Sequence, residues 1–376
     1  MTGAVRHLYV HLPFCSHHCG YCDFVTVVGR RGEHDRYVDA LLAELELQRG
    51  SLAARLETVF FGGGTPTFTE PAALRRVLRG MPPADEVTVE ANPETVTPGL
   101  ARLLRDEGVT RISLGAQSFQ PGLLSMLERR AGPDDVRRAF YHLRDAEFDN
   151  ISLDLIYGIP GQRPADLDAD IDEALALRPE HLSCYELEAK PGTRFTHAHG
   201  EELRRQAEAM EGYFERVVDR LTACGYRWYE TANFCRTAES AGGRDLRSRH
   251  NLAYWLGRDY LGIGIGAVST VVGRRRRNAP RLRAYLEALE AGAVPPRELE
   301  ELGADVRLQE RVMLGLRLDE PFQLAEAGGV VDRAALRRLE DLGLVTRHEG
   351  ENGEEDLALT HRGRLLGGGV TAELLT

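Results

Sequence analysis

The sequence has little basic charge apart from its arginines, and it has few tryptophans. Lysine occurs once, at Lys190, and tryptophan occurs twice in 376 residues. The formal net charge is -11. This balance argues against nucleic acid as the main partner, because phosphate binding requires a concentrated basic surface. We therefore predict no nucleic-acid interface.

Long apolar segments are also missing. No run approaches the roughly 18 consecutive apolar residues of a membrane-spanning helix, and the first residues do not show the basic and apolar regions of a signal peptide. We therefore predict a cytoplasmic protein without an inserted membrane segment. The apolar fraction of 43% and charged fraction of 28% are typical of a globular protein, and the length predicts one large domain and one small domain.

Cysteine is scarce but unevenly distributed. Three of the six cysteines, Cys15, Cys19 and Cys22, lie close together and the others are scattered. In a reducing cytoplasm this spacing favours a metal centre over disulfides. Thiolates are the usual ligands of iron-sulfur clusters, and three of them leave one iron of a [4Fe-4S] cluster open to a small chelating molecule. A zinc site completed by His17, His18 or a distant residue is the alternative.

The first 240 residues alternate short β-branched runs with longer helical patterns, which is typical of βα units around a parallel sheet. The predicted strands are 7–12, 58–61, 87–90, 111–115, 151–156 and 181–185, and the clearest predicted helices are 35–48, 72–78 and 167–176. Polar residues follow several strands, and active residues of such barrels gather at the C-terminal strand ends. We therefore predict an α/β fold, an open, partial (β/α)6 barrel.

Beyond residue 240 the rhythm changes. We predict a barrel over 1–235, an extension of it over 236–296, and a small winged-helix-like C-terminal domain over 297–376, after a linker at Pro295 and Pro296. The glycine spacing at 262–267 is wrong for a dinucleotide loop and favours a packed strand end or a close backbone pass near an adenine. The arginine run 274–277 is expected to be a solvated turn, with contact to haem propionates as the less favoured alternative.

Several motifs resemble the oxygen-independent coproporphyrinogen III oxidase group of radical S-adenosylmethionine (SAM) proteins. The motifs are 9–24 (YVHLPFCSHHCGYCDF), 62–66 (GGGTP), 90–93 (EANP), 115–119 (GAQSF), 154–160 (DLIYGIP) and 250–255 (HNLAYW). The likeness extends over almost the whole chain. It implies a [4Fe-4S] cluster on Cys15, Cys19 and Cys22, SAM at the open iron, and a C-terminal domain of the type found in this group.

The resemblance also assigns the SAM contacts. These are Tyr9, Tyr21, Gly64, Thr65, Glu90, Gln117, Arg129 and Asp154. Chemically, glycine permits close backbone approach, carboxylates and amides can hydrogen-bond ribose hydroxyls, and a guanidinium can pair with the SAM carboxylate. From the residues alone, a bare tight turn or surface salt bridges are equally good interpretations. Arg130 replaces Arg129 if the register shifts by one residue.

One position distinguishes branches of this group. The oxidases carry a further cysteine two residues after the third cluster cysteine, where this chain has Phe24. Together with the few residues that precede Tyr9, this resembles the haem-chaperone branch of the group. That branch also carries the pattern His-Asn-x-x-Tyr-Trp, present here as His250, Asn251, Tyr254 and Trp255.

Histidine is a standard axial ligand of haem iron and aromatic rings suit a flat macrocycle. If this segment is helical, His250 and Tyr254 share one face. A core Trp255 with a hydrogen-bonded His250 is the alternative. The resemblance thus implies a chaperone that binds haem and transfers it to apo-haemoproteins. The rival functions are oxidative decarboxylation of coproporphyrinogen III and a methyl or alkyl transfer that modifies haem. We assign no catalytic residue and leave open whether the protein is an enzyme.

Overall fold

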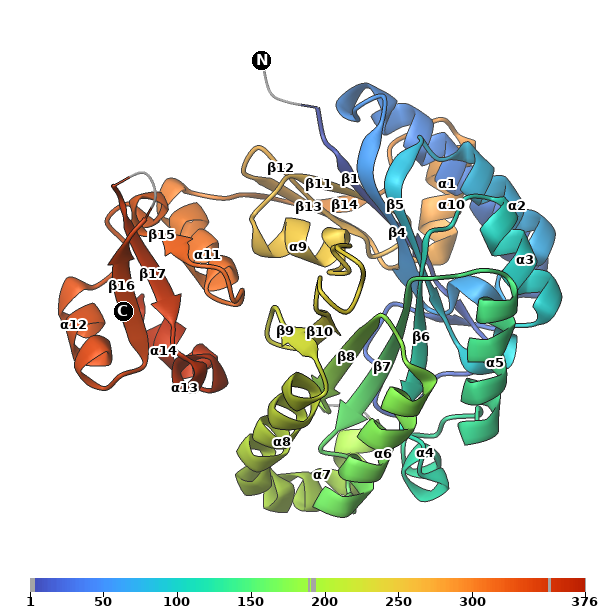
Figure 1. The fold of residues 1–376 in the computed structure, drawn as a ribbon. Coiled ribbons are helices and arrows are strands. Elements are labelled where there is room, and N and C mark those ends of the chain that lie inside the picture. Colours follow the sequence, from blue (N-terminus) through green and yellow to red (C-terminus); the bar gives the residue numbers. More distant parts are fainter. Residues whose placement is uncertain (1–3, 189, 191–193, 351–352, 376) are drawn as a thin grey trace.

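The computed structural model describes residues 4–188, 190, 194–350 and 353–375. Its largest element is a sheet of twelve described strands, whose centre is parallel (Figure 1). The parallel strands in spatial order are β11 (Tyr260–Ile263), β1 (His7–Leu12), β4 (Leu56–Gly63), β5 (Ala84–Ala91), β6 (Arg111–Gln117), β7 (Ile151–Tyr157) and β8 (His181–Glu186). All six predicted strands are confirmed, and β11 is an additional parallel strand beside β1.

Helices cover the outer face of this sheet (Figure 1). They are α1 (His34–Gln48), α2 (Pro71–Gly80), α3 (Pro98–Asp106), α5 (Pro133–Asp145), α6 (Pro164–Leu177), α8 (Met210–Ala223) and α10 (Leu282–Glu290), whereas α4 (Pro121–Met126) and α7 (Arg194–Gln206) lie beside the carboxyl ends of the strands. The five helices from α2 to α6 each begin with proline, whose fixed φ suits the first helical position. Their apolar stripes pack on the strands; α2 buries Leu74, Val77 and Leu78 at helical spacing.

Antiparallel strands extend both sides of the sheet. Beyond β8 lie β10 (Asn233–Arg236) and β9 (Tyr226–Trp228), and beyond β11 lie β12 (Val268–Val271), β13 (Arg274–Asn278) and β14 (Arg297–Glu301). The described sheet therefore ends in two different edge strands, which agrees with an open, partial barrel. The expected solvated turn at 274–277 is wrong. Its arginines form β13 and face the acidic β14, with Arg274 opposite Glu301 and Arg275 opposite Glu300, so cross-strand charge pairing stabilises a strand.

The C-terminal part has a hydrophobic core of its own, which includes Val312, Phe322, Leu336 and Leu357. Its elements are α11 (Ala304–Gly315), β15 (Phe322–Gln323), α12 (Arg333–Asp341), β16 (Val345–Glu349), β17 (Glu355–Leu359), α13 (His361–Leu365) and α14 (Gly367–Leu374). Helices followed by the β16–β17 hairpin have the order expected of a winged-helix-like domain. The strand β14 follows Pro296 directly and still belongs to the large sheet, so the boundaries given above remain a proposal.

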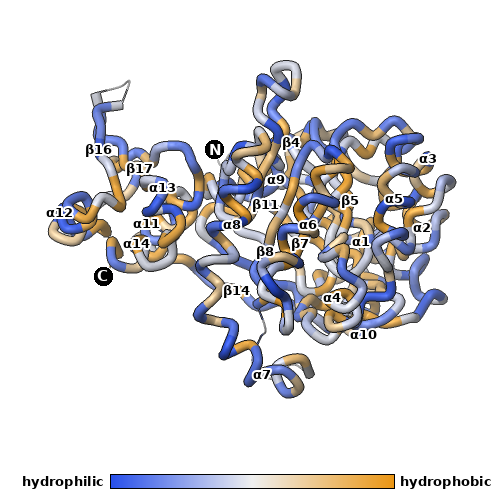
Figure 2. The backbone as a smooth tube through the Cα atoms, turned by 60° about the horizontal axis from the view of Figure 1, so that its bottom comes forward, coloured by the Kyte–Doolittle hydropathy of each residue, from blue (hydrophilic) through white to orange (hydrophobic). Residues whose placement is uncertain are grey.

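Two short strands and one short helix position the site. The strands β2 (Phe14–Cys15) and β3 (Val27–Val28) pair in parallel and enclose the cysteine loop, and α9 (Arg249–Trp255) packs near β4. Short 3-10 turns lie at Arg31–Glu33, Arg49–Ser51, Pro66–Phe68, Pro93–Thr95, Ala207–Ala209 and Leu324–Ala327. Figure 2 shows hydrophobic residues gathered along the inner strands of the large sheet. None of the described helices combines the length and apolarity needed to span a bilayer.

Candidate functional site

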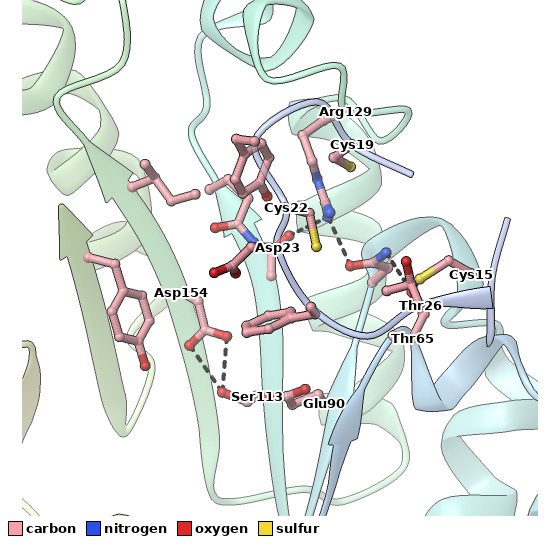
Figure 3. A pocket seen from close by; sticks show the side chains of 18 of the residues that line it. Cys15, Cys19, Cys22, Asp23, Thr26, Thr65, Glu90, Ser113, Arg129 and Asp154 are labelled. Carbon is pink, nitrogen blue, oxygen red and sulfur yellow. Dashed lines mark hydrogen bonds between the residues drawn. The ribbon is translucent and has the colours of Figure 1, made fainter. Parts of the chain in front are cut away.

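A cavity of about 550 Å³ lies where the cysteine loop faces the ends of the parallel strands (Figure 3). Parallel strands present their carboxyl ends at one edge, so residues far apart in sequence meet there. Seven of the eight predicted SAM residues line it, namely Tyr21, Gly64, Thr65, Glu90, Gln117, Arg129 and Asp154. The structure therefore brings these seven residues together at one edge of the sheet.

The three loop thiols line the same cavity. Cys15, Cys19 and Cys22 are free cysteines, and burial raises the pKa of each thiol, that of Cys22 to about 11. As the loop stands, no three or more His, Cys, Asp or Glu side chains in the described part of the chain are arranged as a metal site. The donor set nevertheless fits an iron-sulfur cluster, because three thiols border one cavity and bound iron deprotonates a coordinating thiol.

The two histidines of the loop hydrogen-bond nearby residues. His17 Nε2 lies 2.9 Å from the carbonyl oxygen of Glu128 and 3.4 Å from Cys19 Sγ. His18 Nδ1 lies 2.9 Å from Thr26 Oγ1. The three thiols therefore share the cavity with two imidazoles that are already engaged, and the zinc alternative would require those hydrogen bonds to be exchanged for metal ligation.

A chain of hydrogen bonds joins Arg129 to the cysteine loop. Arg129 Nη2 donates to Asn92 Oδ1 and to the carbonyl oxygen of Gly115, each at 3.0 Å. Asn92 Nδ2 donates to Thr65 Oγ1 at 3.1 Å, and Thr65 Oγ1 lies 3.3 Å from Cys15 Sγ. Arg129 Nε is buried without a partner among the described residues. The guanidinium is therefore held in place with bonding capacity left for an anion.

This arrangement favours Arg129 over Arg130 as the cavity residue and adds Asn92 to the candidate site. Arg129 lines the cavity, whereas Arg130 is exposed and does not. Asn92 was not singled out in the sequence, although it lies in the quoted motif EANP directly after β5. A polar amide at a strand end was the signal that could have identified it.

The glycines around the cavity are required by packing. A side chain at Gly64 would collide with the carbonyl oxygen of Pro13 and come within 3.0 Å of Cys15 Sγ. At Gly115, an added Cβ would lie 2.7 Å from Gln117 Nε2, where the register of β6 shifts against β7 and Gln117 adopts a φ of 65°. These glycines allow the cysteine loop and the Gln117 bulge to approach the strand ends.

Acidic residues occupy the base of the cavity. Asp154 accepts hydrogen bonds from Ser113 Oγ at 3.0 Å and from Ser152 Oγ at 3.2 Å. Burial, followed by the charge of Asp154, raises the pKa of Glu90 to about 8. Arg111 is 2% exposed, lines the cavity and lowers the pKa of both carboxyls through its charge. No sequence pattern singled out Arg111, because it begins β6 instead of ending it.

Of the remaining predicted residues, Tyr9 and His250 lie behind the cavity wall. Tyr9 does not line the cavity; its hydroxyl lies 3.1 Å from His11 Nδ1 and its ring stacks on Phe60. The motif at 250–255 lies in the helix α9. His250 is 1% exposed, with Nδ1 at 2.7 Å from Thr58 Oγ1 and Nε2 at 2.9 Å from the Tyr254 hydroxyl.

These contacts confirm that His250 and Tyr254 share one helix face. Of the four residues of the predicted haem motif, Asn251 lines the cavity and the other three do not. Trp255 instead lies under Arg317, whose guanidinium carbon is 4.3 Å from the ring centroid. For His250 to bind iron, one of its two hydrogen bonds would have to break.

Comparisons with known proteins agree with this geometry. The model of the radical SAM superfamily matches residues 9–174. The chain is 36% identical to the heme chaperone HemW of Mycobacterium tuberculosis over all of this chain and 96% of that protein. It is 32% identical to the heme chaperone HemW of Bacillus subtilis over 99% of both chains. The structure is similar to that of the Escherichia coli coproporphyrinogen III oxidase HemN, described as a radical SAM enzyme, with a TM-score of 0.81, 23% identity and coverage of 99% of this chain and 91% of that one.

Proposed function

Because this chain belongs to the heme chaperone HemW family, within the radical SAM superfamily, we propose that it binds haem and transfers it to apo-haemoproteins. The observation that carries the proposal is that the relationship extends over the full length of the chain and of the relatives. The likeness to the oxidase HemN concerns the fold alone, since the two chains share 23% identity.

The radical SAM family implies a [4Fe-4S] cluster and SAM. We assign the cluster to Cys15, Cys19 and Cys22. Held by three thiolates, such a cluster would leave one iron open for SAM and would supply an electron to the sulfonium group of SAM. The residues of this chain bind and orient SAM: the buried Arg129 has a free Nε for a carboxylate, and the base of the cavity offers Glu90 and Asp154 to hydroxyl or amino groups.

The other assignments differ in how directly they reach the cavity. Tyr21, Gly64, Thr65 and Gln117 complete the proposed SAM contacts at its wall, and Tyr9 supports that wall from behind. The haem contacts remain assigned to the motif His250, Asn251, Tyr254 and Trp255. Asn251 is the member that reaches the cavity in this structure.

Phe24 favours the chaperone over the oxidase. It lines the cavity and is 61% exposed, at the position where the oxidases of this group carry a further cysteine. A phenyl ring can neither ligate iron nor transfer a proton, whereas it offers flat apolar area to a macrocycle. An exposed aromatic residue at this position suits a protein that holds a porphyrin better than one that decarboxylates it.

Product analysis tests the proposal. The chain, reconstituted anaerobically with iron and sulfide, is incubated with SAM, a reductant and either coproporphyrinogen III or haem, and the tetrapyrrole is examined by mass spectrometry. We expect both tetrapyrroles to be recovered unchanged. A porphyrinogen lighter by two carboxyl groups would restore the oxidase function, and an opened or alkylated haem would select the haem-modifying transferase. A Cys19→Ala variant is the control that shows whether any product depends on the cluster.

A further inference from the structure

A second cavity, of about 410 Å³, lies between the large sheet and the C-terminal part. On the side of the large sheet it is lined by residues of α8 and β9, and on the side of the C-terminal part by residues of α11, α13 and α14. Figure 1 shows α8 next to α13. It shares no lining residue with the cysteine-lined cavity. Its volume lies within the range of about 300–1,000 Å³ that is typical of small-molecule sites.

The walls of this cavity are largely apolar and aromatic. Phe214 and Trp228 line one side, with ring centroids 5.6 Å apart in an edge-to-face arrangement. Leu316, Leu365 and Leu375 line the other. Trp228 is 5% exposed and Arg364 covers its ring, so the half-buried Phe214 supplies the aromatic area that a ligand can reach.

Two arginines place positive charge in these apolar surroundings. The guanidinium carbon of Arg364 lies 3.7 Å from the centroid of the Trp228 ring, and Arg317 lies over Trp255. Arg364 Nη2 and Arg317 Nε are buried and have no hydrogen-bond partner among the residues that the structure describes. Burying an unsatisfied donor costs free energy, so both side chains favour an incoming acceptor.

Neighbouring carboxylates satisfy these arginines poorly. The closest recorded pair is Arg317 Nη2 with Glu230 Oε2, at 4.0 Å, and burial raises the pKa of Glu230, which weakens it as a counterion. For Arg364, burial lowers the pKa to about 10, although the charges of Asp319 and Glu230 act in the opposite direction. An anionic ligand would thus meet positive charge that is not neutralised by a close ion pair.

A helix N-terminus adds to this electrostatic field. The eight-residue α14 begins at Gly367, and Gly367 and Gly368 line the cavity. The first backbone N–H groups of a helix lack intrahelical acceptors and favour anions. An added Cβ at Gly368 would meet open space, so a ligand can approach the backbone closely.

Flat apolar walls combined with cationic donors fit an amphipathic carboxylate. We propose that this cavity is a second haem site, in which the macrocycle packs against Phe214 and the leucine side chains and the propionates bind Arg317 and Arg364. The inference rests on the proposed function and extends it, because it gives haem a place separate from the SAM cavity. A fatty acid shares the amphipathic chemistry but carries one carboxylate, whereas haem carries two propionates and the cavity is lined by two arginines.

Anaerobic haem titration of the full, cluster-loaded chain tests the site. In an Arg317→Gln/Arg364→Gln variant we expect haem to bind at least tenfold more weakly, with iron content and SAM affinity unchanged. The matched control is Arg362→Gln, which removes an exposed arginine from the same helix as Arg364 and should change haem affinity less than twofold. Equal haem affinity in the native chain and the double variant would overturn the inference.

Two further comparisons test the site without removing the arginines. Gly368→Phe fills the cavity with both arginines retained and should weaken haem binding, whereas Gly369→Phe, on a neighbouring glycine that does not line the cavity, should not. Haem dimethyl ester, which lacks the carboxylates, should bind the native chain more weakly than haem does. To the double variant, the ester and haem should bind with the same affinity.

The outcomes separate the two proposals. The native chain could bind haem with an affinity that neither the arginine double variant nor Gly368→Phe changes, and bind the ester equally well. That result would reject this site and leave the chaperone function intact. Failure of the native, cluster-loaded chain to bind haem would reject the chaperone function, and this inference with it. Displacement of haem by laurate at equal concentration would show a general fatty-acid site and would also reject the inference.

Discussion

Single residues decide which cofactor the cysteine loop can hold. Cys15, Cys19 and Cys22 line one cavity and are not oxidised to disulfides, so each thiol is available as a ligand. We predict that Cys19→Ala abolishes cluster formation, measured as iron and sulfide content after anaerobic reconstitution. Cys224→Ala, which removes an exposed cysteine outside the cavity, is the control and should retain both. Unchanged iron and sulfide in Cys19→Ala would contradict the assignment.

Glu90 makes a separate prediction about pH. Its pKa is raised to about 8 by burial and by Asp154, against the opposing charge of Arg111, whereas an unfolded glutamate ionises near pH 4.3. Between these values the unfolded chain releases a proton that the folded chain keeps, so the free energy of unfolding falls as pH rises. In Glu90→Gln this contribution disappears.

Chemical denaturation of the cofactor-free chain from pH 5 to pH 8 measures this effect. We expect the unfolding free energy of the native chain to fall relative to that of Glu90→Gln by on the order of 1 kcal/mol per pH unit. The exposed Glu208 supplies the control, since Glu208→Gln should follow the native curve. Parallel curves for the native chain and Glu90→Gln would show that Glu90 ionises normally.

The sequence could predict the loop thiols and the strand-end residues, because parallel strands place their carboxyl ends together. It could not predict which way a side chain points within a strand or helix. Tyr9 and His250 belong to the quoted motifs, yet both pack behind the cavity around Phe60. Conversely, Arg111 reaches the cavity from the start of β6, which no motif indicated.

Among the helices and strands, α9 has its N-terminus bound by a side chain from β5. Glu86 in β5 accepts the backbone N–H groups of Arg249 and His250, each at 3.1 Å, and it is 6% exposed. A carboxylate at this end of a helix satisfies donors that have no intrahelical acceptor. The short α9 thus depends on β5 for its position, and with it Asn251 at the cavity wall.

We predict that Glu86→Ala lowers the unfolding free energy by about 2 kcal/mol, because two buried N–H groups lose their acceptor. Amide hydrogen exchange should quicken in α9 while exchange in the central strands changes little. Glu208→Ala is the matched control on an exposed glutamate. An unaltered exchange rate in α9 would mean that the hydrogen bonds to Ser248 and Thr58 are sufficient to hold it.

Elements were predictable where the hydrophobic period was clear. The strand 7–12 was predicted to the residue, because an apolar run between turn residues is typical of a buried parallel strand. The arginine strand β13 could not be recognised, since its stability comes from glutamates in β14 more than twenty positions later. Pairing between distant charged segments leaves no local signal.

At the scale of the whole molecule, two cavities flank different parts of the large sheet. One joins the cysteine loop to the strand ends, and the other joins the β9 edge to the C-terminal part. Bidentate pairing of Arg227 with Asp319, at 2.7 and 2.9 Å, connects that edge to the C-terminal part. In the proposals made above, SAM occupies the first of these cavities and the second haem site is the other.

The function proposed for this chain is to carry haem. The most direct test is anaerobic titration of the cluster-loaded chain with haem, followed by mixing of the isolated complex with a haem-free acceptor protein, both recorded by optical spectroscopy. We predict uptake of at least one haem per chain, weaker uptake by His250→Ala, and transfer of the bound haem to the acceptor. A chain that holds its cluster but takes up no haem would contradict the account.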